Sequence, residues 1–377
     1  MIIGVPKETR SGETRVGLTP DAIQKLTKKG YQVCVEHLCG ANSGFLDVEY
    51  QSAGAKMGDA QAVFGSEVIV KLHKPVSHQI AWMKKGTLLI SMIEPFEDDG
   101  TISLLAQAQI EAIGMELIPR ISRAQSMDVL SSQAGIAGYR AVIEAASYYG
   151  RFFPLMMTSA GSSKAAQVMV LGAGVAGLQA IATAKRLGAQ VEAYDVRSEV
   201  KEQIQSLGAK FVELNVGEEG AGKGGYAKEL SEEAKRRQQL ALTERLKKCD
   251  IVISTANIPG RKAPVLITEE AVKGMRAGSV IVDLAAGQGG NCPLSQADQV
   301  VVKNGVTLIG WTNYAAFMPA DASSFYANNC IAILDLVIQV QDSQAQDKKL
   351  SLNLDLKDEI IAASLVTYQG NIRLKKV

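Results

Sequence analysis

The feature that most constrains the fold is a glycine-rich turn within VMVLGAGVAGLQAIATAKRLGAQVEAYDVR, residues 168–197. Gly172, Gly174 and Gly177 follow an apolar run and open an amphipathic helical pattern, and Asp195 ends the next apolar run, 18 positions after Gly177. In such a strand–turn–helix–strand unit, the first glycine permits a tight turn, the second lets the backbone approach a pyrophosphate, and the third lets helix and strand pack closely. The helix N-terminus supplies amide groups and a positive dipole end to the phosphates. The segment therefore predicts a Rossmann-type dinucleotide site.

Asp195 indicates which dinucleotide this site prefers. A carboxylate accepts hydrogen bonds from both ribose hydroxyls but repels a 2′-phosphate, so NAD(H) is favoured over NADP(H). Arg197 qualifies this preference, because an arginine nearby can hold a 2′-phosphate. Asn257, which follows the apolar run DIVI, either lines the adenosine or ribose side of the site or belongs to a plain loop.

Apolar runs alternate with helical patterns in two series along the chain. The first series begins with IIGV at Ile2, and the second runs from Gln167 to about Trp311. This alternation predicts an α/β fold of two Rossmann-like, doubly wound parallel-sheet lobes. Two long helices are expected to join the lobes, with a cleft between them. The sequence also predicts the following segments: a first lobe of residues 1–125 and 322–377, a second lobe of residues 126–321, joining helices over 125–149 and 320–340, and a hairpin over 350–370.

Composition narrows the range of functions. The chain has 377 residues and a formal net charge of +1 with no basic block, which argues against nucleic-acid binding and against an anionic membrane surface. No window of about 18 uninterrupted apolar residues exists, so we expect no membrane-spanning helix. The five cysteines fit neither a CxxC pair nor a zinc pattern, and reduced thiols in a cytoplasmic compartment are the simplest interpretation. We expect no bound metal.

A second glycine-rich stretch, GEEGAGKGGYAK at 217–228, follows an apolar run of the second series. It is either a disordered surface loop or a mobile lid that closes over bound nucleotide, in which case Gly225 and Tyr226 would contact the ligand. Gln238, in the helical pattern that follows, would help to anchor the closed form.

The stretch PRISRAQSMDVLSSQ, 119–133, concentrates polar groups just before a long helical pattern. One interpretation is a solvated loop in which Ser122 or Ser126 caps the helix. The other is a nicotinamide site, because a carboxamide needs donors and acceptors, and an Arg120–Asp128 pair would hold the arginine in place. The candidate contacts are Arg120, Ile121, Ser122, Gln125, Ser126, Met127, Asp128 and Ser131.

This cluster has no histidine or lysine. Oxidation of an alcohol or amine by NAD requires a group that removes a proton, whereas hydride transfer between two nicotinamides requires only that the rings be positioned. The cluster therefore favours transfer between nicotinamides. The alternative stays open, because Lys71, His73 or Lys74 in KLHKP could reach the site.

Several of these motifs together resemble domain I, the NAD(H)-binding domain of proton-translocating nicotinamide nucleotide transhydrogenase. They are PKETRSGETRVGLTPDAIQKL, MELIPRISRAQSMDVLSSQ, AGYRAV, GAGVAGLQAIATAKRLGA, GGYAKE, APVLIT and DLAAGQGGNCP. The resemblance implies a homodimer that binds NAD(H) and transfers hydride directly to NADP(H) on a separate domain. It also implies a membrane-embedded domain that couples the transfer to proton movement, and hence a peripheral location at the cytoplasmic face of the membrane.

The resemblance extends to single residues. Arg120, Gln125 and Asp128, with Ser131 beside them, match the catalytic loop of that family. The resemblance also implies nucleotide contacts at Val175, Ala176, Asp195, Val196, Arg197, Gly225, Tyr226, Gln238 and Asn257.

Alanine dehydrogenases share this architecture but carry a catalytic lysine and a histidine in the first lobe. Here His73 stands at the apparent place of that lysine and Met92 where the histidine would fall. Both differences count against amino-acid oxidation. An alanine- or saccharopine-type dehydrogenase remains the alternative function, and a non-catalytic NAD-binding module is the third.

Overall fold

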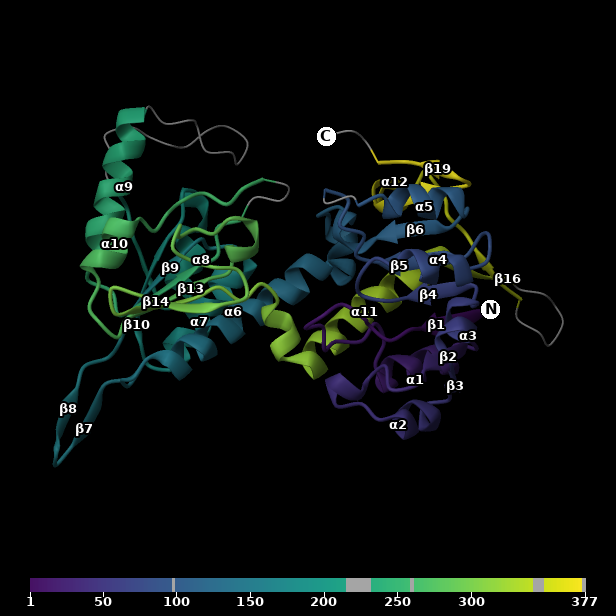
Figure 1. Ribbon diagram of the computed structural model, residues 1–377, viewed down its shortest axis with the longest axis horizontal. Helices are drawn as coiled ribbons and strands as arrows, with labels where there is room; N and C mark the ends of the chain where they lie inside the picture. Colours follow the sequence, from purple (N-terminus) through teal and green to yellow (C-terminus); the bar gives the residue numbers. More distant parts are fainter. Residues whose placement is uncertain (97–98, 215–231, 258–260, 342–348, 375–377) are drawn as a thin grey trace. The chain divides into compact units, whose positions relative to one another are not determined.

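Two sheets organise the chain, one in each of two units (Figure 1). The computed structural model describes residues 1–96, 99–214, 232–257, 261–341 and 349–374. Unit 1 contains residues 1–133 and 315–377, and unit 2 contains residues 134–314. The boundaries expected from the sequence, 125/126 and 321/322, lie eight and seven residues away from these divisions.

The sheet of unit 1 has the strand order of a doubly wound fold. In order across the sheet its strands are β19 (Asn371–Ile372), β18 (Leu365–Tyr368), β6 (Glu111–Gly114), β5 (Leu88–Ser91), β4 (Val68–Val70), β1 (Ile2–Val5), β2 (Gln32–Glu36) and β3 (Lys56–Gly58). The strands from β3 to β6 run parallel, and β18 and β19 add an antiparallel edge. The order reverses between β1 and β4, which makes the carboxyl ends of these two strands the switch point where such sheets bind ligands.

Helices cover both faces of this sheet, because its central strands are apolar throughout. In β4, Val68 and Val70 face one buried cluster while Ile69 faces another. The shorter helices of the unit are α1 (Pro20–Lys28), η1 (Ala41–Ser43), α2 (Asp47–Ser52), α3 (Ala60–Phe64), α4 (Ser77–Trp82), α5 (Thr101–Gln107), η2 (Met115–Leu117), η3 (Ser122–Met127) and α12 (Glu359–Ser364). Thr19 caps α1 and Pro20 occupies its first turn, as the sequence predicts.

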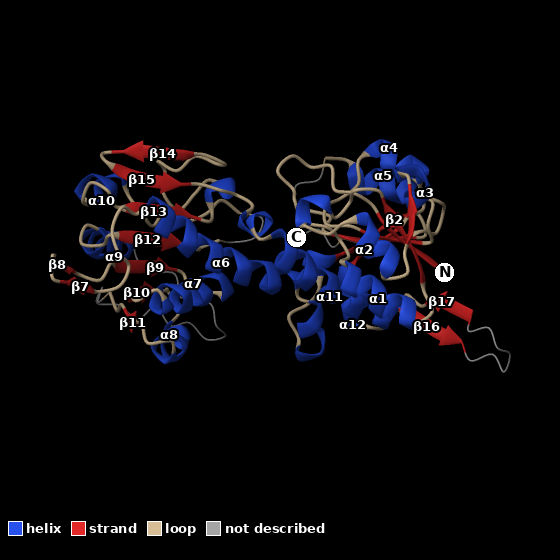
Figure 2. Cartoon of the chain, turned by 90° about the horizontal axis from the view of Figure 1, so that it is seen from below, coloured by secondary structure: helices blue, strands red, loops and turns tan. Residues whose placement is uncertain are grey.

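Unit 2 repeats the order around β9, with the reversal between β9 and β12. Its strands across the sheet are β11 (Lys210–Phe211), β10 (Gln190–Tyr194), β9 (Gln167–Leu171), β12 (Ile251–Ser254), β13 (Val280–Asp283), β15 (Val306–Ile309) and β14 (Val300–Lys303). Figure 2 shows them in a row, and only β14 is antiparallel.

The helices of unit 2 lie on both faces of its sheet. Buried residues of α6 (Val129–Tyr148), α7 (Val175–Arg186) and α8 (Lys201–Ser206) cover one face, and those of α9 (Glu232–Leu246) and α10 (Glu269–Gly274) cover the other. Short 3-10 turns and one small hairpin complete the unit: η4 (Ser198–Val200), η5 (Ala286–Gln288), β7 (Met156–Thr158) and β8 (Gly161–Ser163). The 3-10 turn η6 (Tyr314–Phe317) spans the return to unit 1. The doubly wound α/β fold predicted from the sequence is confirmed.

The two long helices are shorter than expected. The chain passes from unit 1 to unit 2 within α6, which begins at Val129 rather than at 125 because η3 comes first. It returns to unit 1 at Ala315, just before α11 (Pro319–Val337). The residues directly after α11, which alternate apolar and polar, form β16 (Ile338–Gln341), and β16 pairs with β17 (Lys349–Leu352).

The single hairpin predicted over 350–370 is wrong. Its middle forms α12, because the Asp358 side chain accepts hydrogen bonds from the amides of Ile360 and Ile361 and caps a helix there. The strand pairs of this region lie on either side of that helix: β16 with β17 before it, and β18 with β19 after it. In the part of the chain that the structure describes, no helix combines the length and apolarity needed to cross a membrane.

Candidate functional site

The glycine turn of unit 2 has the geometry that its spacing predicts. Gly172, directly after β9, adopts a φ of +93°, which favours glycine. Gly174 begins α7 without a side-chain cap, and a Cβ placed on it would meet no atom within 4 Å. A Cβ on Gly177 would lie 1.9 Å from the Gly172 carbonyl oxygen, so only glycine fits. The uncapped amides of α7 therefore face open space where a pyrophosphate can approach.

Asp195 lies beside this turn at the end of β10. Its Oδ2 accepts a hydrogen bond from the Ala173 amide at 2.7 Å. Its carboxylate also accepts from Arg197, through the backbone amide at 2.9 Å and through Nε and Nη2, each at 3.0 Å. Burial alone raises the pKa of Asp195, but the hydrogen bonds from Arg197 and Ala173 outweigh burial and lower it. The group is thus an ionised carboxylate that is buried, fixed to the turn and paired with the exposed Arg197 side chain.

Small residues on α6 let this helix approach the turn closely. A Cβ on Gly138 would lie 2.0 Å from the Ala176 carbonyl oxygen in the first turn of α7. The side chain of Val175 is exposed next to Ala176. Gly138 of α6 therefore allows close packing against the α7 N-terminus, whereas the sequence indicated only that this segment forms a joining helix.

A buried amide supports the loop that carries Asn257. Asn291, fully buried, donates to the carbonyl oxygens of Ala256 and Pro264, both at 2.8 Å, and accepts from the Ser254 hydroxyl at 2.5 Å. Asn257 itself is exposed at the end of this loop. Sequence analysis missed Asn291. The motif GQGGNCP contains it, but nothing in the motif indicates which strand ends it connects.

The polar stretch of unit 1 forms η3 and the start of α6. Asp128 caps α6: its Oδ1 accepts from the Ser131 amide at 2.9 Å and its Oδ2 from the Ser131 hydroxyl at 2.6 Å. The cap suggested at Ser122 or Ser126 is therefore wrong. The suggested Arg120–Asp128 pair is also absent among the described residues, because the Asp128 carboxylate is turned toward the helix N-terminus.

The remaining candidates of this stretch differ in exposure. Arg120, Ser122, Gln125 and Ser126 are exposed, Ile121 is half-buried, and the Met127 side chain belongs to the core of unit 1. A ligand contact of Met127 would therefore have to involve its backbone. Arg123 fixes the outer side of η3 by donating to both carboxylate oxygens of Asp358, at 2.8 and 3.1 Å.

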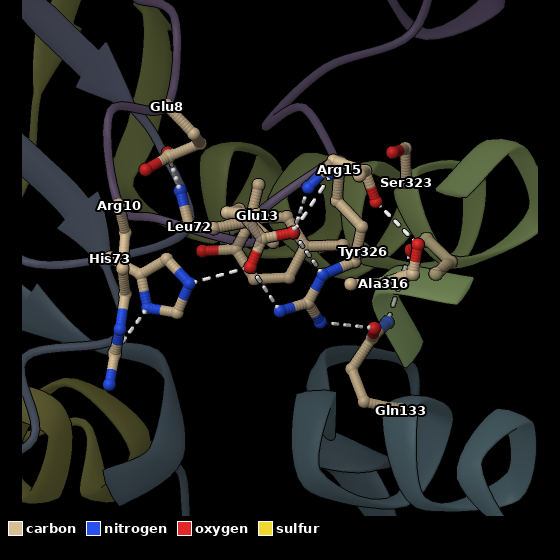
Figure 3. A network of polar contacts seen from close by, with 12 residues as sticks. Glu8, Arg10, Glu13, Arg15, Leu72, His73, Gln133, Ala316, Ser323 and Tyr326 are labelled. Atoms are coloured by element: carbon tan, nitrogen blue, oxygen red, sulfur yellow. Dashed lines mark hydrogen bonds and ion pairs between the residues drawn. The ribbon is translucent and has the colours of Figure 1, made fainter. Parts of the chain in front are cut away.

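The switch point of unit 1 holds a buried network of charges (Figure 3). Arg15 donates Nε and Nη2 to the two oxygens of Glu13, at 2.8 and 2.7 Å, and Nη1 to Gln133 at 2.8 Å. Lys71, directly after β4, donates to Glu8 at 3.2 Å and to the His73 carbonyl oxygen at 2.7 Å. Each of these buried cations is thus bound by groups of the same unit.

His73 connects this network to the surface. Its Nε2 lies 2.7 Å from Glu13 Oε2, and its Nδ1 lies 3.1 Å from Arg10 Nη1 and 3.6 Å from Glu94 Oε1. Burial lowers the pKa of His73, but its interactions with the carboxylates of Glu13 and Glu94 outweigh burial and raise the pKa above its ordinary value. His73 is therefore held as a partner of carboxylates rather than as a free base.

The other candidates lie apart from these groups or outside the described residues. Gly225 and Tyr226 fall within 215–231, which the structure does not describe. Gln238 lies half-buried on α9. The glycine turn, Asp195 and Asn257 come together in unit 2, whereas the stretch from Arg120 to Ser131 belongs to unit 1.

These features define a dinucleotide-binding protein of the Rossmann class, built from two doubly wound units. They are the glycine turn, the N-terminus of α7 without a side-chain cap, and the ionised Asp195. Its domains identify it further. The description "Alanine dehydrogenase/PNT, N-terminal domain" matches residues 4–137, and "Alanine dehydrogenase/PNT, C-terminal domain" matches residues 141–375. The chain belongs to this family of oxidoreductases, which confirms the resemblance inferred from the motifs.

Known proteins of two kinds are similar to the chain. An NAD(P) transhydrogenase subunit alpha chain of Rhodospirillum rubrum is 45% identical, over 99% of this chain and 97% of that protein. The crystal structure of transhydrogenase from Sinorhizobium meliloti is 40% identical and covers 99% of this chain and 98% of its own, with a TM-score of 0.85. An L-alanine dehydrogenase structure is 26% identical, covers 99% of this chain and 96% of its own, and has a TM-score of 0.79.

Proposed function

We propose that the chain is the NAD(H)-binding component of a proton-translocating transhydrogenase and transfers hydride directly between NAD(H) and NADP(H) held by a separate domain. The observation that carries this proposal is the contrast between the two switch points. In unit 2, the uncapped amides of α7 face open space, and the buried Asp195 carboxylate beside them is paired with Arg197, whose side chain is exposed. In unit 1, the buried cations are already bound by neighbouring carboxylates.

This contrast argues against amino-acid oxidation, the alternative function. Such a reaction needs a cation for the substrate carboxylate and a base for the proton of its amine. Arg15 is bound by Glu13 and Gln133, and Lys71 by Glu8 and the His73 carbonyl oxygen. His73 contacts the Glu13 carboxylate through Nε2, and its Nδ1 lies beside Arg10 and Glu94. A substrate would have to displace these buried partners, whereas hydride transfer between nicotinamides requires no group from unit 1's switch point.

Each candidate residue has a proposed role. Asp195 accepts the ribose hydroxyls of NAD(H), Gly174 and the first turn of α7 bind the pyrophosphate, and Val196, Arg197 and Asn257 line the adenosine side. Arg120, Asp128 and Ser131 bind the nicotinamide carboxamide, and Gln125 faces the NADP(H)-binding partner. Further nucleotide contacts are proposed at Ile121, Ser122, Ser126, Met127, Val175, Ala176, Gly225, Tyr226 and Gln238.

The proposed partners are a second copy of this chain, an NADP(H)-binding domain and a membrane-embedded domain, which would hold the complex at the cytoplasmic face of the membrane. The β7–β8 hairpin supports the homodimer, because Figures 1 and 2 show it projecting away from the sheet of unit 2. Phe152, Leu155 and Met157 around it are exposed, with Met157 at 76%. Apolar side chains on a two-stranded projection are poorly placed for water and suited to a protein partner.

A reconstitution assay tests the proposal. The chain is mixed with a separately prepared NADP(H)-binding transhydrogenase domain, NADH and an NADP analogue whose reduction is spectroscopically distinct. We expect hydride exchange that requires both proteins, and no oxidation of L-alanine by NAD. Alanine oxidation without exchange would replace the proposal by the dehydrogenase function, and tight NAD(H) binding without turnover in either assay would reduce the chain to a binding module.

A further inference from the structure

Helix α11 contains a buried amide in its middle, at Asn329. The residue is 7% exposed and its apolar neighbours on the helix include Cys330 and Ile333, which belong to the core of unit 1. An asparagine in a helix interior is less favourable than alanine, and a buried amide without partners costs roughly 1–3 kcal/mol. Its presence here is explained by what it binds.

Both ends of the Asn329 amide are used, and both partners flank the same junction. Nδ2 donates to the carbonyl oxygen of Ser126, near the end of η3, at 2.8 Å. Oδ1 accepts from the hydroxyl of Ser132, in the first turn of α6, at 2.8 Å. Between Ser126 and Ser132 lie Asp128 and Ser131, the proposed nicotinamide ligands.

Other contacts hold the two flanks of the junction: Arg123 pairs with Asp358, and the side chains of Ala124, Met127 and Val129 are buried in the core. η3 consists of a short 3-10 turn whose hydrogen bonds are poorer than those of an α-helix, and its residues Gln125 and Ser126 are exposed. Asp128 and Ser131 bind each other, which shapes the cap but does not tie it to the core. Asn329 hydrogen-bonds to groups on both sides of the cap and links them to the buried face of α11 in the same unit.

We propose that Asn329 is a positioning residue for the nicotinamide-binding junction, acting through the Ser126 carbonyl and the Ser132 hydroxyl. The inference rests on the proposed function for the roles of Asp128 and Ser131. It predicts that loss of the Asn329 contacts slows hydride transfer, because small displacements of positioning groups weaken catalysis strongly. It also predicts that NADH affinity changes little, because the adenosine and pyrophosphate bind in unit 2.

The chain offers a matched pair of variants on the same helix. Asn329→Asp keeps the shape and the acceptor for Ser132, but when ionised it cannot donate to the Ser126 carbonyl. Asn328→Asp introduces the same charge one residue away, at an exposed amide whose Oδ1 accepts from Lys25 at 3.0 Å. Ser132→Ala removes the second contact, together with the longer contacts of the same hydroxyl with the Val129 carbonyl oxygen and the Gln133 amide, and keeps the bond to Ser126. Single-turnover transfer in the reconstituted assay, NADH affinity by titration and urea unfolding are measured for each.

At pH 8 we expect hydride transfer by Asn329→Asp to be at least about tenfold slower than by the parent. The upper limit is the roughly 100-fold loss of rate that a misplacement of about 1 Å can cause. Its NADH affinity should change by less than about threefold, and Asn328→Asp should behave like the parent. Lowering the pH should partly restore transfer by Asn329→Asp relative to the parent, because a protonated carboxyl can again donate to the Ser126 carbonyl. The parent also contains a carboxylate in this junction, Asp128. The pH dependence of transfer by Asn329→Asp is therefore compared with that of the parent.

Parental transfer rates in Asn329→Asp, or an equal loss in Asn328→Asp, would overturn the inference. So would a loss confined to NADH affinity or to folding. Absence of exchange in the parent would contradict the proposed function instead. Amide hydrogen exchange of residues 122–132 would then decide the inference: faster exchange in Asn329→Asp but not in Asn328→Asp supports it, and unchanged exchange overturns it.

Discussion

Arg15 binds Glu13 through two nitrogens of one guanidinium, and the side chains of both residues are almost completely buried. The pair lies only two residues apart in the chain, in the loop after β1, so it is formed locally and then covered by Gln133 and His73. The Arg15 guanidinium is thereby occupied by a carboxylate of the same unit and is not available to a ligand. We therefore expect the Glu13–Arg15 pair to contribute to the stability of unit 1 and not to nucleotide binding.

Removing one partner of this pair should destabilise unit 1. Glu13→Ala leaves Arg15 buried without a counter-charge, which typically costs about 3–5 kcal/mol. We expect a lower urea midpoint and unchanged NADH affinity under native conditions. Glu13→Ala combined with Arg15→Met should recover part of the loss, because the buried guanidinium is removed together with its counter-charge, while His73 still lacks Glu13 as a partner. A single variant that loses less than about 1 kcal/mol would mean that the pair is dispensable.

The stability of unit 1 should fall as pH rises above about 6.5, the ordinary pKa of histidine. The pKa of His73 is raised in the folded state, because its carboxylate partners outweigh the effect of burial. The stabilisation from protonated His73 is therefore complete below the unfolded pKa and is lost as pH rises through the raised folded pKa.

This dependence is measured as the free energy of unfolding between pH 6 and pH 9. His73→Gln should flatten the profile, whereas His78→Gln, at an exposed histidine, should leave it unchanged. A parent profile that rises with pH over this window would show that the pKa of His73 is lowered rather than raised.

Asp195 should determine cofactor choice together with Arg197. Asp195→Asn removes the charge that repels a 2′-phosphate. It also weakens the hydrogen bonds to the Arg197 guanidinium, so that Arg197 becomes available to a phosphate. We expect NADH affinity to fall by about tenfold, or about 1.4 kcal/mol, and the preference over NADPH to narrow. Asp195→Asn combined with Arg197→Ala should lose NADH affinity without gaining NADPH affinity. Titration showing that the parent already prefers NADPH would contradict the assignment.

The hairpin β7–β8 should be required for self-association. Met157→Asp places a charge on an exposed apolar side chain at its tip region, and Leu240→Asp does the same on exposed α9. Sedimentation should show a dimer for the parent and for Leu240→Asp, and a dimer dissociation constant raised at least about tenfold for Met157→Asp. A monomeric parent, or dissociation in both variants, would contradict this role of the hairpin.

Sequence predicted the sheets of this protein well because their signals are local. Apolar runs such as those of β4 and β9 are buried on both faces. The spacing of Gly172, Gly174 and Gly177 predicts the turn because the close contacts that it permits involve backbone atoms nearby. The capping of α12 by Asp358 is also local, but the alternation of apolar residues around it is equally typical of strands. The hairpin prediction is wrong because the helix cap at Asp358 outweighs the strand-like alternation.

Contacts between distant parts of the chain could not be predicted in the same way. Asn329 lies 203 positions from Ser126, and Asn291 lies 37 positions from Ser254. Neither has a characteristic local pattern, since a buried asparagine looks like any polar residue until its partners are known. The Glu13–Arg15 pair was within reach, because the two residues are neighbours in SGETRVG, but their burial depends on Gln133 and His73.

The last prediction concerns the hydride step itself. If Arg120, Asp128 and Ser131 only position a nicotinamide, no protein group gains or loses a proton during transfer, so single-turnover exchange should be nearly flat from about pH 6 to 9. Arg120→Ala and Asp128→Ala should each slow transfer strongly while retaining much of the NADH affinity. Gln125→Asn should slow transfer with little effect on NADH binding. A sharp break near pH 7 that disappears in His73→Gln would instead identify His73 as an acid–base group and return amino-acid oxidation to first place.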